Sequence, residues 1–381
     1  MNLRSSSSSF HQHQKSRKQT LYSMESISYD VDPGGDIELI LRKPNKQKIV
    51  PADQGYNGWE NPGKPEFTNP PCLGRYKVFS ELSPGDECKT LEVEVRMRVF
   101  SRHLTLASRV FRAMLQGSWI EAAPSSQPIR PISTEDWDAF ALAIVLDCIH
   151  GRHFEIPTKI SPGLLTRIST IVDYYQCREA VQVHYRTWTD DSFCRLPSDT
   201  IDDGELNIMW LFVSWVFHDE NRFRKMADKF LRRSPGISNY ETHELPVSAI
   251  LRKLEDKRQT LFEETLEALD NLEMDLMDED GCGEKEDCSA VLLDILTQEK
   301  DYMTDELGTI DPPFDTCLLG SVLEYINDMD TPTVEDFQRQ HPKKKVKFPL
   351  CRCTIQWRLG PTLDEIDRAM RSICLADFQP R

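Results

Sequence analysis

Alternating hydrophobic and polar positions mark two short segments in the first half of the chain. Residues 36–41 (DIELIL) run apolar after a Gly34–Gly35 turn, and residues 91–97 (LEVEVRM) carry an apolar side chain at every second position. A period of two residues is that of a β-strand with one buried face. We therefore predict a strand over each segment, and a short third strand at residues 128–131.

Helical spacing of apolar residues follows in the same half. Gly117 ends the first such run, Ser133 or Thr134 can cap the second, and Ser161 precedes a proline that can open the third. The predicted helices cover residues 104–115, residues from 133 or 134 to 150, residues 162–175 and residues 178–188. Strands and helices mixed in this way predict an α+β fold.

The second half carries almost only helical periodicity, which predicts a helical C-terminal domain over residues 200–381. Its expected helices cover residues 202–233, 246–277, 290–302, 315–329 and 363–373. Arg258 and Thr265 interrupt the apolar seam of the longest one. Packing inside a helical domain is therefore favoured over a free coiled coil.

Two segments show neither the alternation of a strand nor the spacing of a helix. Residues 1–28 begin with a serine-rich stretch free of acidic residues through position 24, and we predict a disordered tail there. Residues 43–90 contain seven prolines and several glycines, which indicates a long loop or insertion. Residues 76–79 are the one part of it with the composition of a strand.

The net charge of −16 is concentrated in one stretch. Residues 263–306 hold 17 acidic and two basic residues, a net of −15, which leaves −1 for the rest of the chain. Direct binding of nucleic acid is not expected, because it needs clustered Lys and Arg. No apolar run approaches the roughly 20 residues of a membrane span. Eleven cysteines without a secretory signal indicate reduced thiols in the nucleus and/or cytoplasm.

Four segments, in order, resemble the BTB/POZ domain. They are residues 36–41 (an opening aspartate and strand), 99–115 (VFSRHLTLASRVFRAML), 147–152 (DCIHGR) and 168–177 (ISTIVDYYQC). The element order of strand, strand, helix pair, short strand and three helices also resembles that family. The resemblance implies a small mixed sheet flanked by helices over residues 29–189, homodimerisation, and recruitment of protein partners. Residues 210–223 and 374–378 are similar to the helical region of BTB/POZ domain-containing proteins of filamentous fungi.

Two features depart from the family pattern. The 43–90 insertion is much longer than the family's connection between its first two strands. The family also often places a basic residue after the second strand, where it pairs with the opening aspartate. Here the matching position holds Ser101, with Arg102 one place further on, opposite Asp36. Co-repressor recruitment through such a pocket is therefore not expected.

No enzyme motif is present: the chain lacks G-x-G-x-x-G, G-x-x-x-x-G-K-[ST], H-E-x-x-H and G-x-S-x-G. We expect no catalytic residue and no enzymatic activity. His103, His150 and His153 are expected in surface or satisfied core positions.

A structural zinc ion is the alternative to a chain without cofactors. Cys282, Cys288, Cys351 and Cys353 form two pairs that could supply four thiolates to a tetrahedral site. Their spacing matches no standard C-x2-C pattern. Buried cysteines without a ligand are the other interpretation.

Two further motifs bear on partners. Lys343, Lys344, Lys345 and Lys347 form a basic run that resembles a nuclear import signal. Trp119, Ile120 and Glu121 follow the first helical run, where BTB proteins that bind a cullin scaffold often carry an apolar-x-Glu triplet.

The leading hypothesis is a non-enzymatic interaction protein, a dimerising adaptor that recruits substrates to a cullin ubiquitin ligase. The alternative is a nuclear transcription-associated cofactor that acts through partners rather than by direct DNA binding.

Overall fold

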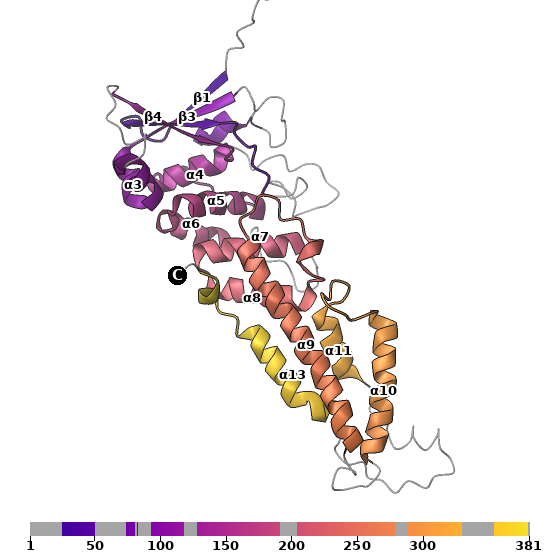
Figure 1. Cartoon of the computed structure of the whole chain (residues 1–381). Coiled ribbons are helices and arrows are strands. Elements are labelled where there is room, and N and C mark those ends of the chain that lie inside the picture. Colours follow the sequence, from indigo (N-terminus) through magenta and orange to yellow (C-terminus); the bar gives the residue numbers. More distant parts are fainter. Residues whose placement is uncertain are drawn as a thin grey trace, which may run out of the picture.

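The computed structural model describes residues 25–49, 74–80, 82, 93–117, 128–190, 204–278, 288–329 and 354–379. Within these residues the chain is mixed α+β, mostly helical, with a four-stranded sheet at one end and a long helical arm at the other (Figure 1). The expected α+β class is confirmed.

The sheet contains β1 (Glu25–Asp30), β2 (Ile37–Arg42), β3 (Val93–Val99) and β4 (Arg130–Glu135), in the spatial order β1-β3-β2-β4. β2 and β3 are antiparallel, whereas β1 runs parallel to β3 and β4 runs parallel to β2. Leu39 lies opposite Met97 and Leu41 opposite Val95, and all four are buried. A slip of one residue would turn these side chains to solvent, so the alternation seen in the sequence fixes this register.

Two strand boundaries differ from the prediction. β1 starts at Glu25, inside the segment expected to be a tail, because it pairs with β3 along its length and buries Tyr29. β4 occupies residues 130–135 rather than 128–131, since its pairing with β2 continues to Glu135. Ser133 and Thr134 are therefore strand residues and not helix caps.

Part of the expected insertion belongs to the core. Residues 74–79 form a 3-10 helix, η2 (Gly74–Phe79), and not the strand considered for residues 76–79. Tyr76 and Phe79 are buried, and the Tyr29 ring lies against both of theirs, with centroids 5.9 and 5.2 Å away. This segment therefore fastens β1 to the rest of the molecule.

The helical run at residues 104–115 is divided into α2 (Ser101–Ala107) and α3 (Arg109–Gln116). Ser108 is extended between them, and its hydroxyl accepts a hydrogen bond from the backbone N–H of Phe111 (3.0 Å). A serine in this position caps the second helix and satisfies one of its free N–H groups.

Helix α4 (Ala139–Ile149) packs against the sheet, and α5 (Pro162–Tyr175) and α6 (Arg178–Asp190) pack in turn on α4 (Figure 1). Asp138 caps α4 by accepting from the N–H of Ala141 (2.8 Å), four or five residues later than predicted. α5 begins at Pro162 as expected, and Ser161 caps it by accepting from the N–H of Leu164. Every residue of α4 is buried, which makes this helix the centre of the sheet end.

The single helix expected over residues 202–233 is two helices, α7 (Gly204–Phe217) and α8 (Glu220–Arg233). His218 has a left-handed backbone (φ 54°), and Asp219 caps α8 through the N–H of Arg222. α7 carries apolar side chains on almost all of its faces, and eleven of its fourteen residues are buried. It packs between α5 and α8.

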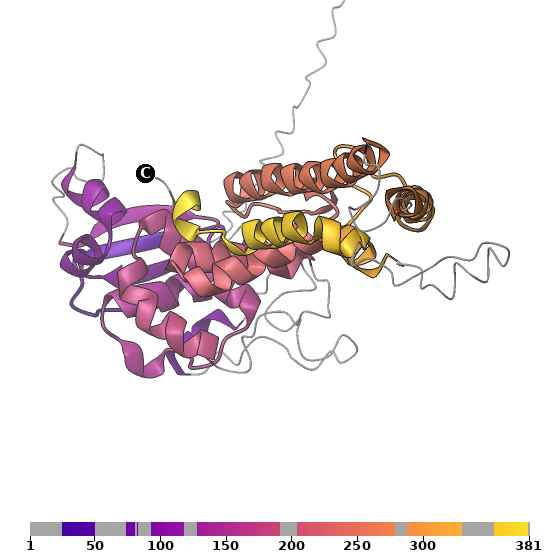
Figure 2. The same ribbon diagram turned by 90° about the horizontal axis from the view of Figure 1, so that it is seen from below.

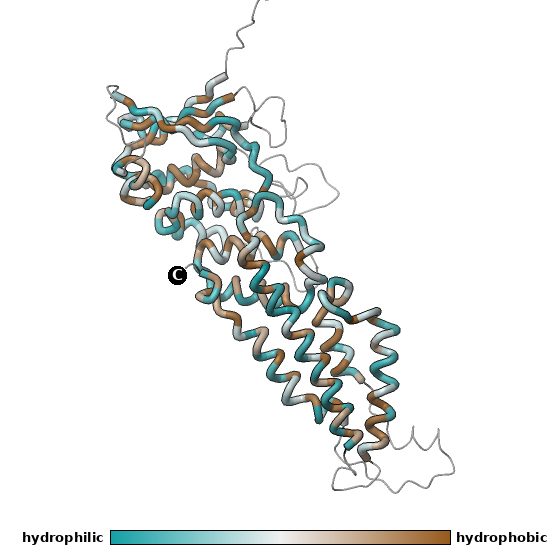
Figure 3. Tube along the Cα trace, in the orientation of Figure 1, coloured by the Kyte–Doolittle hydropathy of each residue, from teal (hydrophilic) through white to brown (hydrophobic). Residues whose placement is uncertain are grey.

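The arm is built on α9 (Ser248–Asp278), which contacts α8, α10 (Cys288–Leu307), α11 (Leu319–Asp328) and α13 (Ile355–Arg371). Figure 2 shows α13 running alongside α9. α9 and α10 alternate between hydrophilic and hydrophobic positions (Figure 3), as one-sided helices do. The expected packing of this long helix within a helical domain is confirmed. None of the described helices is long and apolar enough to cross a membrane.

Candidate functional site

The junction between β2 and α2 holds the aspartate that opens the BTB-like pattern. The Asp36 carboxylate accepts two hydrogen bonds from Ser101, one from its backbone N–H and one from its hydroxyl, both 2.7 Å long. Burial raises the pKa of Asp36, but the bonds from Ser101 outweigh it and hold the pKa below its usual value. Arg102 is exposed and forms no ion pair with Asp36. A neutral serine therefore takes the place that the family often gives to a basic residue.

A buried carboxylate joins β1, η2 and α4. The Asp147 side chain is 1% exposed and accepts hydrogen bonds from Tyr29, from Tyr76 (2.8 Å) and from Arg75 (3.2 Å). Burial raises the pKa of Asp147, and the bonds from the two tyrosines oppose that rise. Each of these groups is engaged by another, so the cluster fastens three elements together.

The three histidines noted in the sequence are not arranged as a catalytic pair. Both ring nitrogens of His150 are occupied, Nδ1 by the Leu146 carbonyl (2.8 Å) and Nε2 by the N–H of Phe100 (2.9 Å). Burial lowers the pKa of His150 to about 4, so the ring is neutral at pH 7. His103 lies against it edge-on, whereas Nδ1 of His153 is 2.8 Å from Nε2 of His184 on the surface.

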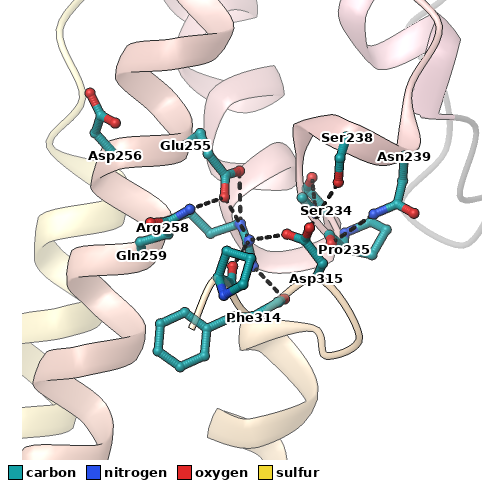
Figure 4. Close-up of polar contacts among 12 residues, drawn as sticks. Ser234, Pro235, Ser238, Asn239, Glu255, Asp256, Arg258, Gln259, Phe314 and Asp315 are labelled. Carbon is teal, nitrogen blue, oxygen red and sulfur yellow. Dashed lines mark hydrogen bonds and ion pairs between the residues drawn. The ribbon is translucent and has the colours of Figure 1, made fainter. Parts of the chain in front are cut away.

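Arg258, which interrupts the apolar seam of α9, is fully buried (Figure 4). Its guanidinium donates to both carboxylate oxygens of Glu255, at 3.0 and 2.7 Å, and to the carbonyls of Phe314 (3.1 Å) and Pro313 (3.0 Å). Asp315 lies 3.8 Å away and also accepts from Ser238, at 2.9 Å. The cluster ties α9 to the loop before α11, and its donors are used in doing so.

A cleft of about 620 Å³ lies where the sheet end meets α7. It is lined by Leu106, Ala107, Arg109, Arg112, Val172, Asp173, Gln176, Arg178, Glu179, Trp215, Val216, His218 and Gln379. These residues come from α2, α3, the end of α5, the start of α6, the end of α7 and the segment after η6 (Leu375–Phe378). Trp215 is held in this wall by a hydrogen bond from its Nε1 to the Phe378 carbonyl (2.8 Å).

Two polar groups in the cleft have no partner within the described part of the chain. Nη1 of Arg178 is buried without a hydrogen bond. The Asp173 side chain is half-buried and forms no hydrogen bond or ion pair, and burial raises its pKa. Sequence reasoning missed both residues, because no motif or period connects positions brought together from six separate segments.

Most of the predicted site residues lie outside the described residues. This holds for Trp119, Ile120 and Glu121, for Lys343, Lys344, Lys345 and Lys347, and for Cys282, Cys351 and Cys353. Cys288, the remaining member of the predicted zinc set, begins α10 and is half-buried. Among the residues that are described, no group of three or more His, Cys, Asp or Glu side chains is placed to hold a metal ion.

Comparison of the chain with protein-family models, with curated proteins and with solved structures finds no match.

Proposed function

We propose that this chain is a non-enzymatic protein-interaction module of the BTB/POZ type, whose sheet end dimerises and recruits partners. The observation that carries the proposal is the order and pairing of its elements. An antiparallel β2–β3 pair leads into the α2–α3 helix pair, β4 then joins β2 in parallel, and α4, α5 and α6 follow. The order of strands and helices is the one implied by the resemblance in residues 36–177.

An interaction role accounts for the buried polar groups better than catalysis does. Asp147, His150 and Arg258 are the groups best placed to acquire unusual chemistry through burial. Each is instead occupied by neighbours from other elements. A catalytic base or acid needs a free position facing a substrate, and these side chains have none to offer.

Dimerisation is the property to test first. Val95 of β3 is fully buried in the core and cannot contribute to the contact, so an interface has to use other side chains. The sheet has two edges, β1 and β4, and an edge strand can pair with a second copy of itself. Light scattering coupled to size-exclusion chromatography should give twice the monomer mass. A monomer at all protein concentrations would contradict this part of the proposal.

We propose further that the partner is a cullin scaffold and that the module acts as a substrate adaptor of a ubiquitin ligase. Affinity purification of the tagged protein, followed by mass spectrometry, should recover a cullin. Glu121→Lys reverses the charge of the proposed contact and should abolish that recovery, whereas Glu264→Lys serves as an exposed control on α9. Recovery of chromatin proteins without a cullin would instead favour the nuclear cofactor.

A further inference from the structure

We infer that the cleft bounded by α2, α3, α5, α6 and α7 is a docking site for an acidic peptide segment of a partner protein. This inference rests on the proposed function and deepens it. It assigns one surface that recruits partners and the kind of segment, an acidic peptide, that binds there. The inference stands on the charge of the lining, on a buried arginine nitrogen without a partner among the described residues, and on the apolar and acidic residues that share the lining.

The lining is positive in a strongly negative protein. Arg109, Arg112 and Arg178 face the cleft together with Asp173 and Glu179, a local charge of +1 in a chain whose net charge is −16. The acidic charge of the chain is concentrated in residues 263–306, whereas this cleft offers three guanidinium groups to an acidic segment. Guanidinium groups suit the task, because their planar N–H fork matches a carboxylate.

Arg178 is the residue that most directly indicates a ligand. Its Nη1 is buried yet unbonded within the described residues, although a buried donor normally has a partner. Two arginines of α8 behave differently: Arg222 is paired with Asp219 (2.5 Å) and Arg232 with Asp228 (3.1 Å). A carboxylate placed in the cleft would supply the acceptor that the fold withholds from Arg178.

The remaining residues of the lining indicate a peptide rather than a simple anion. The Asp173 side chain, unpartnered among the described residues, can accept a hydrogen bond from a peptide backbone N–H, a donor that small inorganic anions lack. Leu106 is 80% exposed at the edge of the cleft, and Trp215 is fixed in its wall. A segment with an apolar side chain next to an acidic one would contact both kinds of surface at once.

Fluorescence anisotropy provides the test. The probe is a short labelled peptide of alternating glutamate and leucine, and its counterpart replaces every glutamate by glutamine. The full-length protein should bind the acidic probe more tightly than the glutamine peptide. Arg178→Gln should weaken binding of the acidic probe about tenfold, because a charge-assisted hydrogen bond is lost. Arg186→Gln, the same change on an exposed position of α6, should leave it unchanged.

A second variant keeps the test interpretable if Arg178→Gln does not fold. Circular dichroism will show whether each variant is folded. Arg109 is exposed, so Arg109→Gln should leave the fold intact and weaken binding of the acidic probe about threefold. Equal binding of the acidic and glutamine peptides would overturn the inference. So would unchanged affinity in both cleft variants, or tighter binding of a short oligothymidylate than of the acidic peptide.

Affinity purification with the same variants separates this inference from the proposed function. Partners recovered by the wild type and by Arg186→Gln, but lost with Arg178→Gln, would support the cleft as the recruitment surface. Partners recovered equally by all three proteins would overturn the cleft and leave the interaction module standing. Failure of the wild type to dimerise or to recover any partner would count against the module itself, whatever the peptide does.

Discussion

Removal of the Arg258 guanidinium should destabilise the arm severely. Arg258→Met keeps the aliphatic length of the side chain but leaves Glu255 as a buried carboxylate, 6% exposed, without its cation. It also removes the donors to the carbonyls of Pro313 and Phe314. Breaking a buried ion pair from one side costs about 3–5 kcal/mol. We expect a loss of about 4 kcal/mol, a large share of the roughly 5–15 kcal/mol by which folded proteins are stable.

A second substitution tests whether the unpaired charge causes this loss. The double variant Glu255→Gln with Arg258→Met has no buried carboxylate, so it should be less destabilised than Arg258→Met alone. Arg252→Met changes an exposed arginine of the same helix and should alter the free energy of unfolding by about 0.5 kcal/mol or less.

Urea unfolding followed by circular dichroism at several temperatures measures these differences. Limited proteolysis should show in addition that Arg258→Met opens the segment around Pro313 and Phe314, since two of its anchoring bonds are lost. The reasoning is refuted if the free energy of unfolding of Arg258→Met lies within about 1 kcal/mol of the wild-type value. It is equally refuted if the double variant is less stable than the single one.

Three further predictions concern the buried titratable groups and the cysteines. Burial lowers the pKa of His150 from 6.5 to about 4, so as the pH falls the unfolded chain binds a proton at this ring before the folded chain does. The contribution of neutral His150 to the free energy of unfolding should therefore be fully present above pH 6.5 and fall by about 3 kcal/mol as the pH drops to 4. His150→Gln, which can keep both hydrogen bonds, should flatten urea midpoints across that range, and an unchanged slope would contradict the assignment. Burial raises the pKa of Cys148, and that of Cys177 to about 12, so iodoacetamide should leave both unmodified in the native protein at pH 7, as peptide mass spectrometry can establish. The four-cysteine zinc site predicts one equivalent of zinc by elemental analysis of the purified protein, and a lower content argues for unligated thiols.

The parts of the fold that were predictable from the sequence are those with a local signal. β3 was found because Val95 and Met97 alternate with charged residues, and α5 because Ser161 and Pro162 mark its start. β1 escaped because the partner that makes it a strand, β3, lies more than sixty residues away. Local pattern carries no information about such pairing.

Two boundary errors have separate causes. Thr134 has a good capping side chain, but the pairing of β4 with β2 claims its backbone, and Asp138 caps α4 instead. The break at His218 was missed for another reason: α7 is apolar along its whole length, and periodicity disappears in a helix buried on all sides. The cleft was beyond sequence reasoning, because Arg178 and Asp173 acquire meaning only from the segments that enclose them.

The burial of α7 has a mechanical consequence. This helix packs against α5 on one side and α8 on the other, and the buried residues of the sheet end and the arm form one continuous cluster through it. A close-packed interior resists compression and shear, so the described helices behave as a rigid spacer. Whatever the sheet and the far end of α9 each hold is therefore kept at a set separation and orientation.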